Sequence, residues 1–294
     1  MSTLTESPQA LTREVYGPAT DASAPLLVLS HGITDNAACW VEAVELWTAQ
    51  GYRVLALDAR GHGTSPRWQE ADLVSQDSAG ERLAQDLEEV LEDVRVKGLA
   101  GEGPVMGPLV LVGHSMGGVT SLVVAARRPE LVDAVVAEDP AFTTATSRRV
   151  LRLTAFQRLR EVQEIASDPQ ARFAKEITAN PTWSHREVAA SVKGVVDCDQ
   201  AFLKTGCVGP TTPWQEVVDA LSLPVLLVTG TGDDVIMNQA RLAELLKRNP
   251  RLSTAIIEGA PHCVRRTYSG RFHSVVDPWL RFQTAQHPKQ TDLS

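Results

Sequence analysis

Short apolar runs recur along the chain, and longer stretches of mixed polarity separate them. The runs are rich in β-branched residues and do not alternate with polar ones; they are Leu26–Leu29, Val54–Leu57, Leu109–Val112, Ala134–Ala137, Val225–Val228 and Ala255–Ile257. Runs of this kind are typical of strands buried on both faces of a parallel sheet. We therefore predict an α/β fold in which a mostly parallel central sheet is flanked by helices.

The clearest helix pattern lies between the second and third of these runs. A capping box, Ser78-x-x-Glu81, marks its start. The apolar residues that follow fall on one stripe: Leu83, Leu87, Val90, Leu91 and Val94. This pattern predicts a helix from Ser78 to Val96 that packs against the sheet.

The alternation of strands and helices stops after Pro140. Residues 141–222 are mainly helical in pattern, with polar faces and no strong strand. Pro224 then opens the next apolar run, and the first residue of a strand is a position where proline is tolerated. We predict that residues 1–140 and 223–294 form one α/β core and that residues 141–222 form a helical cap inserted into it.

Composition and charge narrow the classes of function. A chain of 294 residues, 43% of them hydrophobic, can bury the core of one large domain. Its 28 Lys and Arg against 36 Asp and Glu leave a net charge of −8, which argues against nucleic acid as a partner. Residues 1–7 lack the pattern of a signal peptide, and no segment reaches the apolar length of a membrane span. We expect a cytoplasmic protein with no membrane contact.

The four cysteines show neither a C-x-x-C pair nor the spacing of a zinc site. We therefore expect no metal and no disulfide framework.

The strongest chemical motif follows the third apolar run. Gly113-His114-Ser115-Met116-Gly117 is a G-x-S-x-G pentapeptide, and a helical pattern from Met116 to Arg127 continues from it. A serine at such a sharp strand-to-helix turn stands above the sheet edge, and the flanking glycines avoid clashes within the turn. Ser115 is the predicted nucleophile.

A serine hydroxyl needs a base within hydrogen-bond reach and a third group that orients the base. His262 follows the last apolar run in a short loop, at the strand end where active sites of open α/β sheets gather. We predict His262 as the general base. Arg265 and Arg266 follow it closely; we interpret them as a solvated pair of charges, with attraction of a substrate carboxylate as the alternative.

The orienting carboxylate has several candidates. Asp233 follows the strand that Pro224 opens, and the chain order Ser115, Asp233, His262 is the one expected of a triad on a nucleophile elbow. Asp233 is therefore our prediction, and its neighbour Asp234 is an alternative. Glu138 and Asp139 form a rival acid site, because they end the strand expected beside that of Ser115.

Acyl transfer also needs donors for the developing oxyanion, and backbone N–H groups supply them without reorganisation. Met116 lies at a helix N-terminus, and Ile33 follows the first central strand in Ser30-His31-Gly32-Ile33. We predict the N–H groups of Ile33 and Met116 as the oxyanion hole. His31 is interpreted as structural.

Together these motifs resemble the α/β-hydrolase fold superfamily, and in particular its cap-bearing serine hydrolases. The segments that carry the resemblance are His31-Gly32, Asp58-x-Arg60-Gly61-His62-Gly63-x-Ser65, Gly113-His114-Ser115-Met116-Gly117-Gly118, Gly230-x-x-Asp233 and Gly259-Ala260-x-His262. The resemblance implies the triad Ser115, Asp233 and His262, the same two oxyanion donors, and a variable helical cap over the substrate. It also makes Trp40 similar to a tryptophan of cap-bearing members that hydrolyse C–C bonds or esters, so Trp40 is, with Trp183 and Trp214, a predicted substrate-binding residue.

These expectations combine into one function. We predict a hydrolase of carboxylic esters or lactones that works through an acyl-enzyme and needs no cofactor. Aromatic residues of the predicted cap favour a small apolar or aromatic substrate; they are Trp183, Phe202 and Trp214. Hydrolysis of a C–C bond and cofactor-free perhydrolysis use the same triad and stay open, as does a non-catalytic ligand receptor on this scaffold. Homo-oligomerisation is also left open.

Overall fold

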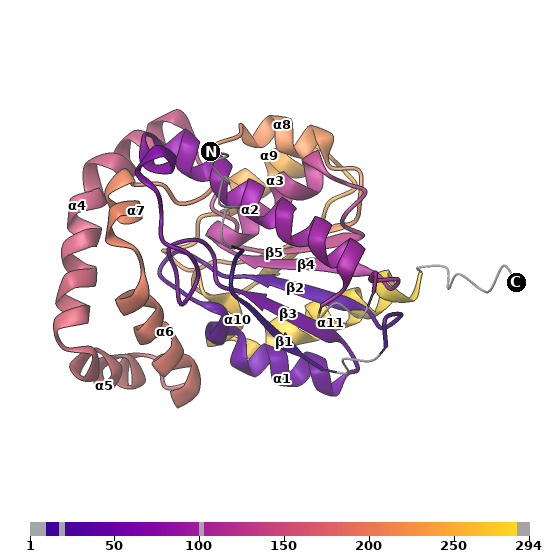
Figure 1. Cartoon of the computed structure of the whole chain (residues 1–294), viewed down its shortest axis with the longest axis horizontal. Coiled ribbons are helices and arrows are strands. Elements are labelled where there is room, and N and C mark those ends of the chain that lie inside the picture. The colour runs from indigo at the N-terminus through magenta and orange to yellow at the C-terminus, as the bar shows by residue number, and fades with distance from the viewer. Residues whose placement is uncertain (1–9, 18–20, 100–102, 287–294) are drawn as a thin grey trace, which may run out of the picture.

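A twisted sheet forms the centre of the molecule (Figure 1). The computed structural model describes residues 10–17, 21–99 and 103–286, and in that part of the chain the sheet has seven strands. From edge to edge they are β1 (Arg13–Tyr16), β3 (Arg53–Leu57), β2 (Leu26–Ser30), β4 (Leu109–His114), β5 (Ala134–Glu138), β6 (Val225–Gly230) and β7 (Ser253–Ile257). Residues 1–7, on which the expectation about a signal peptide rests, lie outside the described residues.

All six predicted strands are present and pair in parallel. The predicted mostly parallel α/β architecture is therefore confirmed. The sequence pattern missed β1, which pairs antiparallel with β3 at one edge. Its sequence, Arg-Glu-Val-Tyr, is polar because one side of an edge strand faces water. At the opposite edge β7 is also largely exposed, unlike the buried central strands.

Helices cover both faces of the sheet and each face has its own apolar core. On one face lie α2 (Gln76–Lys97), α3 (Met116–Arg127), α8 (Trp214–Ala220) and α9 (Gln239–Arg248). On the other lie the 3₁₀ helix η1 (Ala37–Trp40), α1 (Val41–Ala49), α10 (Val264–Thr267) and α11 (Ser269–Ala285). The predicted helix at Ser78–Val96 is α2, but its capping box is formed by Ser75 and Ser78, one turn before the predicted pair.

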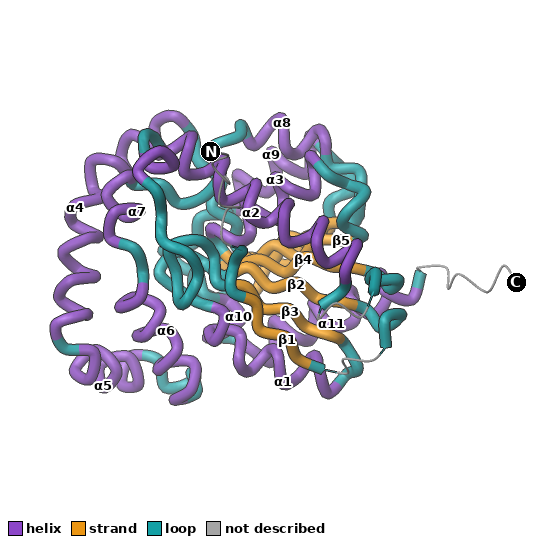
Figure 2. The backbone as a smooth tube through the Cα atoms, in the orientation of Figure 1, coloured by secondary structure: helices purple, strands orange, loops and turns teal. Residues whose placement is uncertain are grey.

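The segment between β5 and β6 adds a further helical layer. We call its first four helices the inserted helices; they are α4 (Ala145–Ser167), α5 (Pro169–Ala179), α6 (His185–Asp197) and α7 (Gln200–Thr205). Loops from the sheet gather beside them (Figure 2). The fifth helix, α8, lies apart and packs against α3 and α9 in the core (Figure 1). The layer formed by the inserted helices therefore ends with α7, whereas the cap predicted from the sequence extends to residue 222.

The inserted helices contact the sheet's carboxyl edge through an apolar cluster. Phe202 and Leu203 of α7 and Val162 of α4 pack there with Met116, the first residue of α3. Ile33, which follows β2, packs against the same cluster. Both predicted oxyanion donors therefore lie beneath the inserted helices. None of the helices in the part of the chain that the structure describes is long and apolar enough to cross a bilayer.

Candidate active site

Ser115 occupies a strained turn between β4 and α3. Its φ of 52° and ψ of −111° are outside the usual regions for a residue with a side chain. The neighbouring glycines are required by close packing: a Cβ on Gly117 would lie 2.1 Å from the carbonyl oxygen of Ser30, and one on Gly113 2.4 Å from that of Gly117. The predicted elbow geometry is therefore present.

Backbone hydrogen bonds fix the elbow to the neighbouring strand. The Ser115 N–H donates to the Glu138 carbonyl at 2.9 Å, and the Ser115 carbonyl accepts from the Ala141 N–H at 3.0 Å. Glu138 is the last residue of β5. The candidate nucleophile is thus attached to the strand end that carries the adjacent Asp139.

The His262 imidazole pairs with Asp139. Nδ1 of His262 lies 2.5 Å from Oδ2 of Asp139, whose side chain is fully buried. The Asp139 carboxylate also accepts hydrogen bonds from three groups of the β6 strand and the loop after it: Thr229 Oγ1, Ile236 N–H and Met237 N–H. Burial alone would raise the pKa of Asp139, but the bond to His262 and the two N–H donors lower it below its ordinary value. Asp139 is therefore held as a carboxylate.

This pairing corrects the prediction that Asp233 orients His262. Asp233 is exposed in the loop after β6. The alternative Asp234 accepts a hydrogen bond from the His262 backbone N–H at 3.0 Å, so it braces the loop and not the ring. Strand order does not select between the two acids, because β6, which Asp233 follows, lies between β5 and β7, the strand that precedes His262. The difference is that Asp139 is buried and fixed by three donors, whereas Asp233 is exposed.

Glu138, the other alternative acid, is also not the partner of the imidazole. It is buried, and its Oε1 accepts from the backbone N–H of Arg265 at 2.7 Å. Of the rival pair at the end of β5, Asp139 thus faces His262, and Glu138 holds the segment after it. The sequence could not show which of these two consecutive carboxylates faces His262, so it did not separate their roles.

His262 shares the sheet edge with the elbow. Its ring centroid lies 4.7 Å from that of His114, the residue before Ser115, and His114 Nε2 lies 3.3 Å from the His262 carbonyl oxygen. His114 is itself buried; burial would lower its pKa, but Cys263, Glu138 and Asp35 raise it well above the ordinary value.

The loop after β2 packs closely on the elbow. The Gly117 N–H donates to the His31 carbonyl at 3.0 Å, and a Cβ on Gly32 would lie 2.7 Å from Nδ1 of His114. Ile33 follows, and Met116 occupies the first turn of α3, where N–H groups have no acceptor within the helix. The loop and the helix N-terminus therefore meet next to Ser115, as the predicted oxyanion hole requires.

Two buried histidines shape this loop. His31 accepts from the Ala59 N–H at 3.0 Å through Nε2, so its predicted structural interpretation agrees with its contacts. His62 places Nδ1 3.0 Å from the Arg60 carbonyl and accepts from the Thr34 N–H at 3.4 Å through Nε2. Thr34 has a φ of 63°, a third positive value at the site after those of Ser115 and Asp139. Burial lowers the pKa of His62 to about 3, so its ring is neutral.

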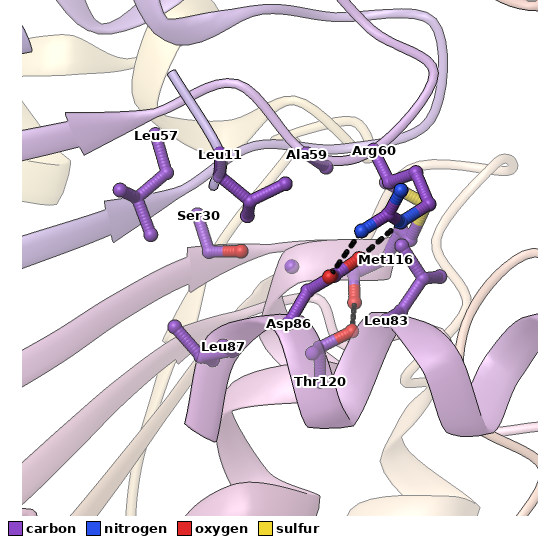
Figure 3. Close-up of a pocket in the computed structure, with 11 residues that line it drawn as sticks. Leu11, Ser30, Leu57, Ala59, Arg60, Leu83, Asp86, Leu87, Met116 and Thr120 are labelled. Atoms are coloured by element: carbon purple, nitrogen blue, oxygen red, sulfur yellow. Dashed lines mark hydrogen bonds and ion pairs between the residues drawn. The ribbon is translucent and has the colours of Figure 1, made fainter. Parts of the chain in front are cut away.

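A small cavity lies behind the elbow, on the side of α2 (Figure 3). It measures about 20 Å³, room for about one water molecule, and Met116 and Thr120 contribute to its wall. On another side of it Arg60 forms a two-pronged ion pair with Asp86 at 2.8 and 2.7 Å (Figure 3). The cavity is too small for a substrate, and the buried ion pair supports the loop after β3.

The predicted aromatic pocket residues lie in three different environments. Trp40 is buried in the core against α1, with the Arg265 guanidinium 4.3 Å from its ring, and is not a pocket wall. Trp214 packs in the core beside Arg241 of α9, also away from the expected pocket. Trp183 precedes α6 and donates to Thr267 Oγ1 at 3.1 Å. Phe202 stacks on Trp68 with ring centroids 4.8 Å apart.

The comparison with protein families agrees with this geometry. A family model described as "Serine aminopeptidase, S33" matches residues 21–267. The chain belongs to that family. It is an α/β hydrolase, and the predicted membership of the α/β-hydrolase superfamily is confirmed.

Curated relatives of the hydrolase include an esterase and a lipase. It is 30% identical over 257 residues to esterase Rv0045c of Mycobacterium tuberculosis, a match covering 83% of this chain and 78% of that protein. It is 34% identical over 155 residues to the Mus musculus sn-1-specific diacylglycerol lipase ABHD11, covering 52% of this chain and 45% of the lipase. The hydrolase thus spans less than half the length of that lipase.

A solved structure shares the fold over nearly the whole chain. E-2-(acetamidomethylene)succinate hydrolase superposes with a TM-score of 0.69 at 21% identity, covering 92% of this chain and 95% of that one. The comparison establishes the shared architecture of the hydrolase.

Proposed function

We propose that this α/β hydrolase is a serine esterase that cleaves carboxylic esters through an acyl-enzyme, with Ser115, His262 and Asp139 as its triad. The observation that carries the proposal is the 2.5 Å contact between the His262 ring and a buried Asp139 that three further donors hold in place. Such a carboxylate fixes both the orientation and the tautomer of the base.

The mechanism follows from the tautomer. With the Nδ1–H donating to Asp139, Nε2 of His262 has a free lone pair that accepts the Ser115 hydroxyl proton as Oγ attacks the ester carbonyl. The N–H groups of Ile33 and Met116 stabilise the negative oxygen of the tetrahedral intermediate. The His262 imidazolium then protonates the leaving alcohol. In the second half, His262 takes a proton from the water molecule that attacks the acyl carbonyl, and it returns this proton to Ser115 Oγ as the bond between Oγ and the acyl carbon breaks and the acid leaves.

The inserted helices supply a cap in this proposal. Their apolar cluster above Met116 and Ile33 includes Phe202, Leu203 and Val162. These side chains are buried against one another, so in this proposal they keep the region above the two oxyanion donors apolar. A small-molecule ester with an apolar acyl or alkoxy group suits such a region, because burial of apolar surface stabilises its complex. A lactone is a cyclic form of the same bond, and the esterase among the relatives favours an open ester as the first substrate to test.

The test combines covalent labelling with a substrate panel. The wild-type protein should react with a fluorophosphonate probe at Ser115, located by mass spectrometry, and should hydrolyse p-nitrophenyl esters and a matched series of lactones. Ser115→Ala should lose both properties while it keeps its circular dichroism spectrum. Hydrolysis of the panel by Ser115→Ala at the wild-type rate would contradict the proposal. Stoichiometric ligand binding without any turnover by the wild type would favour a receptor.

A further inference from the structure

The segment after His262 is attached to the inserted helices by three consecutive side chains. Arg265 Nη1 lies 2.7 Å from Oε1 of Glu187 on α6, the Arg266 guanidinium lies 5.3 Å from the Trp183 ring, and Thr267 accepts from Trp183. Both arginines are buried, which corrects the expectation that they form a solvated pair of charges. The candidate base is therefore close in sequence to residues that attach α6 to the core.

Arg265 connects Glu187 to the acid end of the triad. Both side chains of the Arg265–Glu187 pair are only 4% exposed. The Arg265 guanidinium also donates to the Cys39 carbonyl at 3.0 Å, and its backbone N–H donates to Glu138. Glu138 immediately precedes Asp139 and holds the Ser115 N–H through its own carbonyl. One guanidinium thus joins α6 to the segments that carry the triad residues.

We propose that Glu187 is a positioning residue for His262, which it orients through Arg265. The inference rests on the proposed function. It assigns to an inserted helix a contribution to the chemical step in addition to covering the substrate, since Glu187 is paired to Arg265.

The local charges explain why removal of Glu187 should disturb the triad. Arg265 Nε and Glu138 Oε2 are buried without a hydrogen-bond partner among the described residues, and they lie 3.9 Å apart. Without the Glu187 charge, the guanidinium is attracted to Glu138 as its remaining carboxylate. The Glu138 carboxylate would then bind the Arg265 guanidinium as well as the Arg265 N–H. If Glu138 moves to do so, it displaces both Asp139, the next residue, and the loop that carries His262.

Other charged groups face the same region and are unchanged by this substitution. Asp139 faces the His262 ring, Asp234 holds its backbone N–H, and His114 lies against it from β4. Asp35 faces His114 and Arg266 from the loop after β2. A weaker Asp139–His262 pair stabilises the imidazolium less, so proton transfer from Ser115 to the base should be slower.

The test compares Glu187→Gln with Arg186→Gln. Arg186 is the adjacent residue of α6 and also pairs with the core, but its side chain is 54% exposed and its ion pairs are with Glu42 and Glu45 of α1. Glu187→Gln should lower kcat for a p-nitrophenyl ester between about 10-fold and about 100-fold with KM within twofold, because a small misplacement of a catalytic group has that cost. Arg186→Gln should change neither value by more than twofold.

A double-variant cycle tests the route through Arg265. If Glu187 acts only through that residue, Glu187→Gln should lower kcat no further when Arg265→Gln is already present. Three results would overturn the inference. They are additive losses of kcat in the double variant, an equal fall of kcat in Arg186→Gln, and a normal kcat in a folded Glu187→Gln protein. If Glu187→Gln does not fold, Glu187→Asp replaces it; an intermediate fall in kcat supports the inference and a wild-type kcat overturns it.

A second measurement separates this inference from the proposed function. The His262 Nδ1–H resonance can be observed by NMR and assigned with His262→Gln. If the wild type hydrolyses no ester, the esterase proposal fails, yet a shifted or lost resonance in Glu187→Gln but not in Arg186→Gln still supports the positioning inference. Identical resonances in the two variants overturn it.

Discussion

Asp139 Oδ2 and His262 Nδ1 lie 2.5 Å apart although the two residues are 123 positions apart in the chain. Asp139→Asn should keep the fold but remove the charge that stabilises the imidazolium and selects its tautomer. We expect kcat to fall on the order of 10⁴-fold. Steady-state hydrolysis of a p-nitrophenyl ester measures the change, and a circular dichroism melt establishes that the variant is folded.

Asp233→Asn is the matched control for that substitution. Asp233 was the acid predicted from the sequence, and it is exposed in the loop after β6. Its removal should leave kcat within about twofold, since exposed substitutions away from the site have small effects. A large fall in kcat for Asp233→Asn, together with a near-normal kcat for Asp139→Asn, would show that Asp233 is the acid of the triad.

Substitution of an elbow glycine by alanine should change stability very differently from the same substitution at a glycine with open space around it. Gly117→Ala would place its methyl group 2.1 Å from the Ser30 carbonyl oxygen, so we expect a loss of about 1–3 kcal/mol or more in the free energy of unfolding. In α11, a methyl group on Gly270 would meet no atom outside its own stretch of helix within 4 Å, and Gly270→Ala should raise stability by about 0.5–1 kcal/mol. Urea titrations of both variants check the pair, and equal destabilisation would contradict the steric argument.

The buried Arg60–Asp86 ion pair should be costly to break from one side. Both side chains are about 5% exposed or less, and Asp86→Ala would leave Arg60 without its bidentate partner. We expect destabilisation of about 3–5 kcal/mol. The exposed Lys193–Asp197 pair on α6 is the comparison, where Asp197→Ala should cost less than about 1 kcal/mol. Chemical denaturation midpoints that fall equally in both variants would be inconsistent with this difference.

His62 should make the fold sensitive to mild acid. Its pKa falls from about 6.5 in the unfolded chain to about 3 in the folded protein, because it is buried and lies beside His31. Between these values the unfolded state binds the extra proton, so stability decreases as pH falls, by about 1.4 kcal/mol per pH unit for this group. The protonated ring would also oppose the Thr34 N–H that Nε2 now accepts.

His62→Asn tests this linkage because it removes the titrating group. The free energy of unfolding at pH 7, 6 and 5, from urea titrations, should fall less steeply in the variant than in the wild type, even if the variant is less stable at pH 7. Parallel pH dependences would show that His62 does not titrate between the two states in this range.

The sequence alone determined the features that depend on local pattern. Continuous apolar runs predicted all six parallel strands, and the G-x-S-x-G motif predicted the elbow at Ser115, because strand burial and a tight turn each restrict consecutive residues. The same reasoning located His262 at a strand end. It missed β1, whose polar residues match the water-facing side of an edge strand.

Only the tertiary structure decided which distant residues meet. Glu138 ends β5, and Asp139, Asp233 and Asp234 follow strands; burial and three donors from β6 and its loop hold Asp139 against His262. Trp40 and Trp214 belong to the core, although their aromatic character also suited a pocket. The reason is that local pattern specifies the element a residue occupies, whereas its partners depend on how elements far apart in the chain pack together.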